Sequence, residues 1–269
     1  MVDVGASLQE GDTQDFDLLH ATGKLRVVGF EPNHEECDKL NAHFGDPHRY
    51  FPFFVGDGNE GTFYEIAFYE CASLLKPNQD LIKNYSNFAH FTEVTGTRDV
   101  STVRLDDIDE IGDADFIKFD VQGAEMLCLS GARRLLSEHV LFLKCEYIFI
   151  DVYEGQTRIG DMQNFLGECG LLMHGADIPW GRCYEPFFKP GQPDGYFRQQ
   201  VFTDIYFVKD FTKLRDFESE KLKRLAVLLH IVTRSYDFCC HILKILDERE
   251  PGLKYADHYL EAVIKSRSA

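Results

Sequence analysis

The sequence predicts an α/β fold, with a mostly parallel sheet covered by helices on both faces. Short apolar runs alternate with segments of helical periodicity up to about residue 210, which is typical of repeated strand–helix–strand units. The strand-like runs are mainly apolar, β-branched or aromatic, as expected for strands that are buried on both faces. Beyond residue 210 the chain is highly charged and shows helical periodicity only, so we expect a helical extension after the α/β part.

The individual elements follow in order along the chain. Strands are predicted at residues 1–4, 25–30, 50–55, 116–119, 140–145 and 201–208. Helices are predicted at residues 15–21, 35–44, 124–136 and 161–169. Two longer pieces, 56–113 and 174–197, are rich in Gly, Pro and aromatic residues. We expect loops in both, because long irregular segments are common where a substrate is bound. The second piece is either a lid or a surface excursion.

The domain boundary is predicted at residue 210, with the α/β domain at 1–210 and a helical extension at 211–269. Apolar residues of the extension recur in steps of three and four, which places them on one stripe of a helix or a helix pair. These residues are Leu222, Leu225, Leu229, Val232, Tyr236, Cys239, Leu243 and Leu246. The stripe must be covered. Packing on the same chain is the simpler explanation, and a homodimer through these helices is the alternative.

Composition excludes several classes of protein. The formal net charge of −17 over 269 residues argues against a nucleic-acid partner, because phosphate binding needs Lys and Arg. No apolar run is long enough for a membrane span and no signal peptide is visible, so we expect a cytoplasmic protein. The eight cysteines form no C-x-x-C pair, which predicts reduced thiols and no protein-built metal site.

Two positions at predicted strand ends indicate a nucleoside site. Gly5 follows the first strand, and Glu31 ends the second strand in "VVGFEPN". An acidic residue at that place accepts hydrogen bonds from both hydroxyls of a ribose in dinucleotide-binding folds. The G-x-G-x-x-G pattern is absent, since Ser7 and Gln9 stand where glycines would be expected. A pyrophosphate needs those glycines, so S-adenosylmethionine fits better than NAD.

Further acidic residues follow the later strands. Asp57 in "FVGDGN" is placed to contact an adenine amino group, and Asp120 ends the strand in "FIKFDVQGAE". Glu125 falls in the first helical turn, where it stabilises the helix dipole. Glu146 ends the neighbouring strand, and we expect it beside Asp120. A loop after this strand brings three more candidates for substrate contact, Tyr153, Glu154 and Gln156.

Several motifs occur together in a known order: "DVGAS", "VVGFEPN", "SLLKPN", "STVRLDDI", "FIKFDVQGAEMLCLSGARRLL" and "YEGQ". In this order they resemble the FkbM-type methyltransferase family, and the tail with "SYDFCCHILKIL" is similar to an extension in one branch of it. The resemblance implies a Rossmann-like class I methyltransferase fold with a seven-stranded sheet and S-adenosylmethionine as the cofactor. It also implies methyl transfer to a hydroxyl oxygen of a sugar, glycan or secondary metabolite. Members commonly carry sequence before this first strand, so we expect either a minimal start or a missing N-terminal segment.

The resemblance also implies roles for individual residues. Those implied to bind the cofactor are Asp3, Gly5, Ala6, Glu31, Pro32, Asp57, Gly58 and Asp120. Asp120 and Glu146 are the candidate catalytic residues. Asp120 is either the base that accepts the hydroxyl proton or a carboxylate that binds the cofactor ammonium group. The two carboxylates could together hold a hard cation, but we predict a site without a metal.

Two other function classes remain open at this point. An NAD-dependent dehydrogenase would share the strand order and the acidic residue at position 31, but it would need the fuller glycine turn. A catalytically silent binding or assembly module would keep the fold and use the helical tail to bind a partner. Binding of S-adenosylmethionine without transfer to any hydroxyl would indicate the silent module.

Overall fold

The computed structural model describes residues 1–8, 13–192, 195–250 and 252–267. It contains two compact units. Met1–Ser7 and Arg26–Val208 form the first, and Leu8–Leu25 with Lys209–Ala269 form the second. The first helix of the chain, α1 (Thr13–Ala21), therefore groups with the C-terminal helices. Every cysteine is a free thiol.

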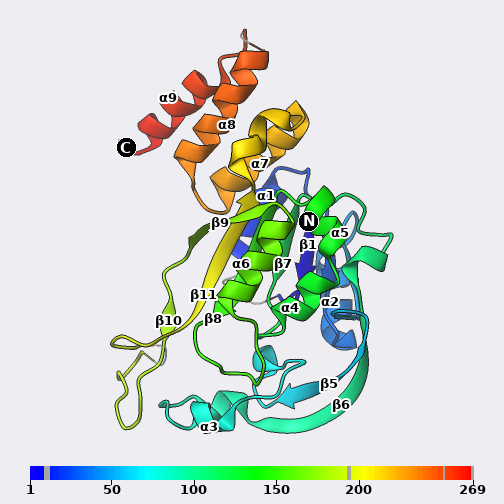
Figure 1. Cartoon of the computed structure of the whole chain (residues 1–269), viewed down its shortest axis with the longest axis vertical. Helices are drawn as coiled ribbons and strands as arrows, with labels where there is room; N and C mark the ends of the chain where they lie inside the picture. The colour runs from blue at the N-terminus through cyan, green and yellow to red at the C-terminus, as the bar shows by residue number, and fades with distance from the viewer. Residues whose placement is uncertain (9–12, 193–194, 251, 268–269) are drawn as a thin grey trace. The chain divides into compact units, whose positions relative to one another are not determined.

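The first unit is built on a sheet of eight strands in the order β10-β11-β8-β7-β1-β2-β3, with β9 also paired to β11 (Figure 1). The strands are β1 (Val2–Val4), β2 (Val28–Phe30), β3 (Arg49–Phe51), β7 (Phe116–Phe119), β8 (Phe142–Ile148), β9 (Leu171–Ala176), β10 (Trp180–Gly181) and β11 (Gln200–Lys209). The central strands from β3 to β8 are parallel, and β11 is antiparallel to β8. The predicted fold class is confirmed. The sheet has one strand more than the seven implied by the resemblance. Two of its strands, β9 and β10, are not among the six strands predicted by position.

A second, smaller sheet occupies much of the region that was predicted to contain loops. It has three strands in the order β4-β6-β5, and β5 and β6 form a long antiparallel pair (Figure 1). The strands are β4 (Phe54–Val55), β5 (Glu60–Ile66) and β6 (Val94–Val103). The sequence did not reveal this pair, because β6 is mostly polar and exposed and so lacks the apolar pattern of a buried strand.

Helices join these strands and complete the first unit. They are α2 (His34–Phe44), α3 (Gln79–Ile82), α4 (Glu125–Ser130), α5 (Arg133–Glu138) and α6 (Ile159–Glu168), with the 3₁₀ turns η1 (Tyr69–Cys71), η2 (Ala89–Thr92) and η3 (Leu105–Asp107). The single helix predicted at 124–136 is divided between α4 and α5 near Gly131. A Cβ atom at Gly131 would lie 2.0 Å from the carbonyl oxygen of Gly56, so only glycine fits this contact.

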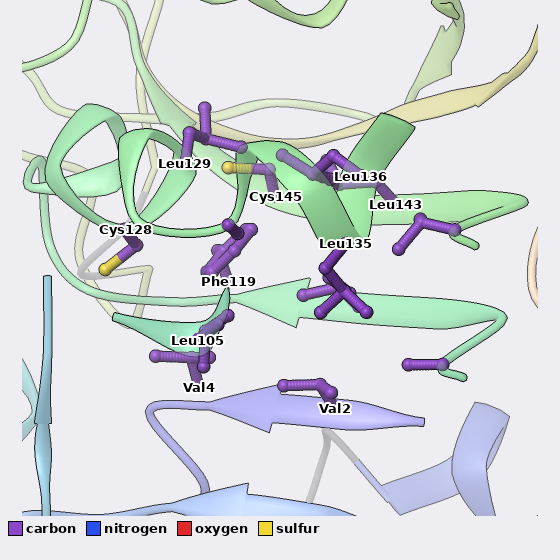
Figure 2. Close-up of a cluster of buried hydrophobic side chains, with 14 of the residues drawn as sticks. Val2, Val4, Leu105, Phe119, Cys128, Leu129, Leu135, Leu136, Leu143 and Cys145 are labelled. Carbon is purple, nitrogen blue, oxygen red and sulfur yellow. The ribbon is translucent and has the colours of Figure 1, made fainter. Parts of the chain in front are cut away.

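One face of the main sheet forms the hydrophobic core with α4, α5 and α6. Val4 of β1, Phe119 of β7 and Leu143 of β8 belong to this core, together with Cys128 of α4 and Leu136 of α5. Figure 2 shows the side chains of these strands gathered against those of α4 and α5. Because side chains alternate along a strand, the residues between these core positions lie on the opposite face.

The second unit is helical. It contains η4 (Phe211–Asp216), α7 (Ser219–Ile231), α8 (Tyr236–Arg249) and α9 (Tyr255–Arg267), and α8 packs against both α7 and α9. Six residues of the predicted stripe are buried. Leu222, Leu225 and Leu229 lie on α7 and Val232 lies at its end. Cys239 and Leu246 lie on α8. The predicted domain boundary at residue 210 and the predicted homodimer stay predictions. No helix in the described part of the chain is long and apolar enough to cross a membrane.

Candidate functional site

The face of the main sheet opposite the hydrophobic core carries a row of buried charges. Lys118 of β7 and Lys144 of β8 are direct neighbours in the sheet, and they are only 3% and 8% exposed. The Lys118 ammonium nitrogen lies 4.0 Å from Asp3 Oδ1 and 3.6 Å from Asp120 Oδ2. Lys144 Nζ lies 3.0 Å from Asp204 Oδ2. Burial of a charged group is costly without an opposite charge, so each lysine supports the carboxylates beside it.

Gly5 brings the end of β1 directly against the end of β7. Its φ of +78° and its position leave no room for a side chain, since a Cβ atom would lie 2.0 Å from the carbonyl oxygen of Asp120. The N–H groups of Gly5 and Ala6 both donate to the carbonyl oxygen of Phe30, at 3.0 and 3.1 Å. The predicted cofactor loop is therefore a tight turn whose first two amides are already paired. Gln9, the other position used in the sequence argument, lies outside the described residues.

Glu31 lies just beyond β2, at the same edge of the sheet as Gly5. Its Oε1 atom accepts a hydrogen bond from the Asn33 N–H at 2.7 Å and another from the Tyr69 hydroxyl. In the described part of the chain, no donor is within hydrogen-bond distance of its Oε2 atom. Burial raises the pKa of Glu31, while the Tyr69 hydroxyl and the Asn33 N–H oppose this rise. One carboxylate oxygen is thus fixed by the protein and the other remains able to accept a ligand donor.

The remaining predicted cofactor residues lie at different distances along the chain from Glu31 and make different contacts. Pro32 links Glu31 to Asn33, whose side chain caps α2. Asp57 lies at the end of β4, and both of its carboxylate oxygens accept hydrogen bonds from Asn59, which lowers its pKa. The neighbouring Gly58 donates its N–H to a side chain of β6 at 3.0 Å. Among the described residues, no hydrogen bond or ion pair joins Asp57 to the residues around Gly5.

Asp120 and Glu146 are brought together by a residue that the sequence argument did not select. The side-chain nitrogen of Gln122 donates to Asp120 Oδ1 at 3.0 Å and to Glu146 Oε2 at 2.9 Å. Its Oε1 lies 3.2 Å from the hydroxyl of Tyr153. Gln122 has a φ of +54°, a left-handed conformation that is uncommon for a residue with a side chain. Its carbonyl oxygen accepts a hydrogen bond from the Ser73 hydroxyl at 2.8 Å.

Asp120 and Glu146 lie in different electrostatic surroundings. Burial, and then the negative charge of Asp120, raise the pKa of Glu146 well above its ordinary value, while Lys118 opposes this rise. Asp120 is the more open of the two partners of Lys118, with a side chain that is 32% exposed against 13% for Asp3. Of these two acids, Asp120 is the one that a substrate hydroxyl can reach more readily.

Glu125 has a local structural role. It is 2% exposed in the first turn of α4, and its Oε1 atom accepts a hydrogen bond from the Gly123 N–H at 3.0 Å. Burial raises the pKa of Glu125 to about 7, with hydrogen bonds from its own backbone and from Gly123 opposing the rise. Because its pKa lies near 7, the charge of Glu125 changes as the pH passes through neutrality.

The loop that follows β8 was predicted to contact substrate, and its residues differ in what they do. Gln156 is buried and makes three hydrogen bonds, all with the backbone of Ile148, Ile150 and Tyr153. These polar atoms hold the loop together, and the predicted contact of Gln156 with substrate stays a prediction. Tyr153 is also buried. Its hydroxyl donates to the carbonyl oxygen of Cys71 in the η1 turn at 2.8 Å and lies 3.2 Å from the side-chain oxygen of Gln122. Glu154 is exposed and pairs with a lysine before α3.

Several residues of the site were not predicted from the sequence, although the spacing of two of them indicated their position. Lys118 precedes Asp120 by two residues, and Lys144 precedes Glu146 by the same spacing. This repeat at the ends of adjacent strands would have predicted charges on a common face. Tyr69 had no such signal, because it is 38 residues from the glutamate to which it donates.

Asp120 and Glu146 are the two carboxyl groups that could together hold a cation. Among the described residues, no group of three or more His, Cys, Asp or Glu side chains is arranged to hold a metal ion. The Gln122 amide nitrogen lies between Asp120 and Glu146 and donates to both. In this arrangement the two carboxyl groups are bridged by a neutral donor.

Comparison with known proteins identifies the family. Residues 3–173 match the family described as the methyltransferase FkbM domain. No curated protein sequence matches the chain significantly. A solved structure of an FkbM methyltransferase from Methylobacillus flagellatus KT has 20% identity and a TM-score of 0.42, and the match covers 76% of this chain and 42% of that one.

A second solved structure, magnesium protoporphyrin IX methyltransferase from Synechocystis PCC 6803 with bound SAM, has 12% identity and a TM-score of 0.38, with 77% and 68% of the two chains covered. This chain spans less than half of the length of the Methylobacillus protein. The match to the FkbM domain extends over most of the α/β unit, from β1 to β9. The chain therefore belongs to the FkbM methyltransferase family.

Proposed function

We propose that this protein transfers a methyl group from S-adenosylmethionine to a hydroxyl oxygen of a sugar, glycan or secondary metabolite. The observation that carries the proposal is the position of Glu31 and Asp120. Both follow parallel strands at their carboxyl ends, on either side of the Gly5 turn. Ligands of open α/β sheets bind at this edge.

The residues present suit a nucleoside without phosphates. Oε2 of Glu31 is available to accept hydrogen bonds from a ribose, while Oε1 is held in place by two protein donors. The amides of Gly5 and Ala6, which would cradle a pyrophosphate in a dinucleotide site, donate instead to Phe30. This arrangement favours S-adenosylmethionine over NAD.

The chemistry assigned to the protein is positioning and proton removal. S-adenosylmethionine, when bound, supplies a methyl group on a positively charged sulfur. The carbon–sulfur bond breaks while the acceptor oxygen forms its bond to the methyl carbon, and the hydroxyl proton must leave. Asp120 is proposed to accept that proton. The alternative role for Asp120 is to bind the cofactor ammonium group without taking a proton.

The cofactor assignment is tested by titration calorimetry on the whole chain. S-adenosylhomocysteine is expected to bind and NAD is not. Glu31→Ala is expected to weaken binding by roughly 1.5 to 3 kcal/mol, because charge-assisted hydrogen bonds to the ribose are lost. Glu35→Ala is the matched control, since Glu35 is an exposed acid in the first turn of α2. Unchanged affinity of Glu31→Ala would remove Glu31 from the cofactor site.

The transfer reaction is tested with radiolabelled S-adenosylmethionine and a panel of glycans and hydroxylated metabolites. Asp120→Asn keeps the size and the hydrogen bonds of the side chain but removes the proton acceptor. As a base, Asp120 predicts a fall in turnover on the order of 10² to 10⁴ with cofactor affinity nearly kept. Lost affinity with retained turnover of bound cofactor would instead assign Asp120 to the ammonium group. Label on nitrogen or carbon acceptors alone would contradict O-methyl transfer.

A further inference from the structure

We infer that Gln122 is a positioning residue that sets the orientation of Asp120 at the reacting centre. This inference rests on the proposed function and deepens it. Three independent features of the surroundings of Gln122 carry the inference.

The first feature is the use of the whole side-chain amide. A glutamine nitrogen has two N–H groups, and those of Gln122 serve Asp120 at 3.0 Å and Glu146 at 2.9 Å. Its oxygen is within 3.2 Å of the Tyr153 hydroxyl. The reverse orientation of the amide would place its oxygen against two carboxyl oxygens. A carboxylate can only accept hydrogen bonds, so Asp120 favours the amide nitrogen on its side.

The second feature is the rigidity of the groups that hold Gln122. Tyr153 is fully buried, and its hydroxyl also lies 2.8 Å from the carbonyl oxygen of Cys71. The Gln122 backbone is tied to Ser73 through its own carbonyl oxygen at 2.8 Å. The amide is thus anchored to the segment after β5, separately from its bonds to the carboxyl groups. A catalytic group is held to within a fraction of an ångström only when its supporting residues are themselves fixed.

The third feature is the backbone conformation. Gln122 has a φ of +54° and is followed by Gly123 at +90°. A residue with a side chain loses roughly 1 to 2 kcal/mol in this region, whereas glycine does not. A second glycine would satisfy the turn at lower cost. The side chain of Gln122 is therefore retained against the local preference of the backbone, and its visible contacts are the two carboxyl groups and Tyr153.

Two variants test the inference by separating catalysis from folding. Gln122→Glu has nearly the same shape but loses both donors, and Gln122→Gly removes the side chain while relieving the left-handed backbone. We expect turnover to fall about 10²-fold in each, the loss typical of a misplaced catalytic group. We expect S-adenosylhomocysteine affinity to change less than turnover, and the melting temperature of Gln122→Gly to be no lower than that of the parent chain. Gln163→Glu, the same change at an exposed position of α6, should leave all three unchanged.

A second measurement does not depend on activity. The side-chain amide hydrogens of Gln122 should exchange slowly with solvent in ¹⁵N-labelled protein, and Asp120→Asn and Glu146→Gln should each shift the amide resonances. Turnover retained in both Gln122 variants would overturn the inference, as would a parallel loss of affinity and melting temperature in Gln122→Gly. Exchange as fast as that of Gln163 would also overturn it. If the parent chain transfers no methyl group but this amide is protected, the proposed function fails and the arrangement around Gln122 stands.

Discussion

The two faces of β7 and β8 bury different side chains. On one face, Ile117 and Phe119 of β7 and their neighbours on β8 are fully buried in the hydrophobic core. On the other face, Lys118 and Lys144 are almost as well buried, but they are charged. Burial of an apolar side chain stabilises the fold by roughly 1.5 to 3 kcal/mol, whereas a buried charge is costly until it is paired. Phe116 and Phe142, on the same face as the lysines, are also fully buried. The comparison teaches that both faces contribute apolar burial, whereas the charged groups for chemistry lie on one face only.

The largest effect is expected when the apolar face is broken. Phe119→Ala should lower the free energy of unfolding by about 3 to 5 kcal/mol, because it leaves a cavity in a fully buried position. Denaturant unfolding measures the change. Phe149→Ala, at an exposed phenylalanine just after β8, is the control and should cost much less. Equal losses in the two variants would show that the apolar face does not provide the main stability.

A smaller loss is expected on the charged face. Lys118→Met keeps the length of the side chain but leaves Asp3 and Asp120 without their nearby cation. We expect a loss of roughly 2 kcal/mol in unfolding free energy, below the range for close buried pairs because both distances are long. The double variant Lys118→Met with Asp3→Asn should recover part of the loss. If Lys118→Met is as stable as the parent chain, the lysine is not needed to hold these carboxylates.

The third effect depends on pH. The pKa of Glu125 is about 7 in the folded chain against an ordinary value of 4.5. Between these two values the folded state holds a proton that the unfolded state has released, so the parent chain loses stability as the pH rises. Glu125→Gln removes this loss and should be more stable than the parent chain at pH 8 by roughly 3 kcal/mol, since each unit of pKa difference corresponds to about 1.4 kcal/mol.

At pH 4 the stability advantage of Glu125→Gln should largely vanish, because Glu125 is then protonated in the folded state and mostly so in the unfolded state. Thermal melts at both pH values test this prediction. Glu138→Gln, at an exposed acid of α5, is a suitable control. A stability advantage that is the same at both pH values would contradict the assigned pKa.

The sequence was informative where local pattern decides the structure. The central strands and the acidic residues at their ends were predicted from apolar runs and from the position of Glu31 and Asp120. The β5–β6 pair was missed because its stability comes from pairing between strands rather than from an apolar pattern. The division between α4 and α5 was missed because it depends on a close contact of Gly131 with another segment.

The candidate site shows the same limit at the level of single residues. Glu31 could be chosen from its place after a strand, but its partner Tyr69 depends on how a distant turn folds back. Gln122 stands in a quoted motif, yet its left-handed conformation gives no signal in the sequence because glycine is the residue expected there. The surroundings of Glu31 and of Gln122 depend on contacts between segments far apart in the chain. The local pattern of residues does not predict such contacts.

Buried cysteines lie both in the hydrophobic core and near the candidate site, so their reactivity can report local opening of each region. Burial raises the pKa of the Cys128 and Cys145 thiols on the apolar side, and it raises the pKa of Cys71, near Tyr153, to about 12. Only a thiolate reacts readily with an alkylating agent or an oxidant. These three thiols therefore resist both reagents at neutral pH in the folded chain, and alkylation at one of these sulfurs marks the moment when its surroundings open. Comparing the alkylation rates of Cys71 and Cys128 would show which part of the domain opens first, without any need to know the substrate.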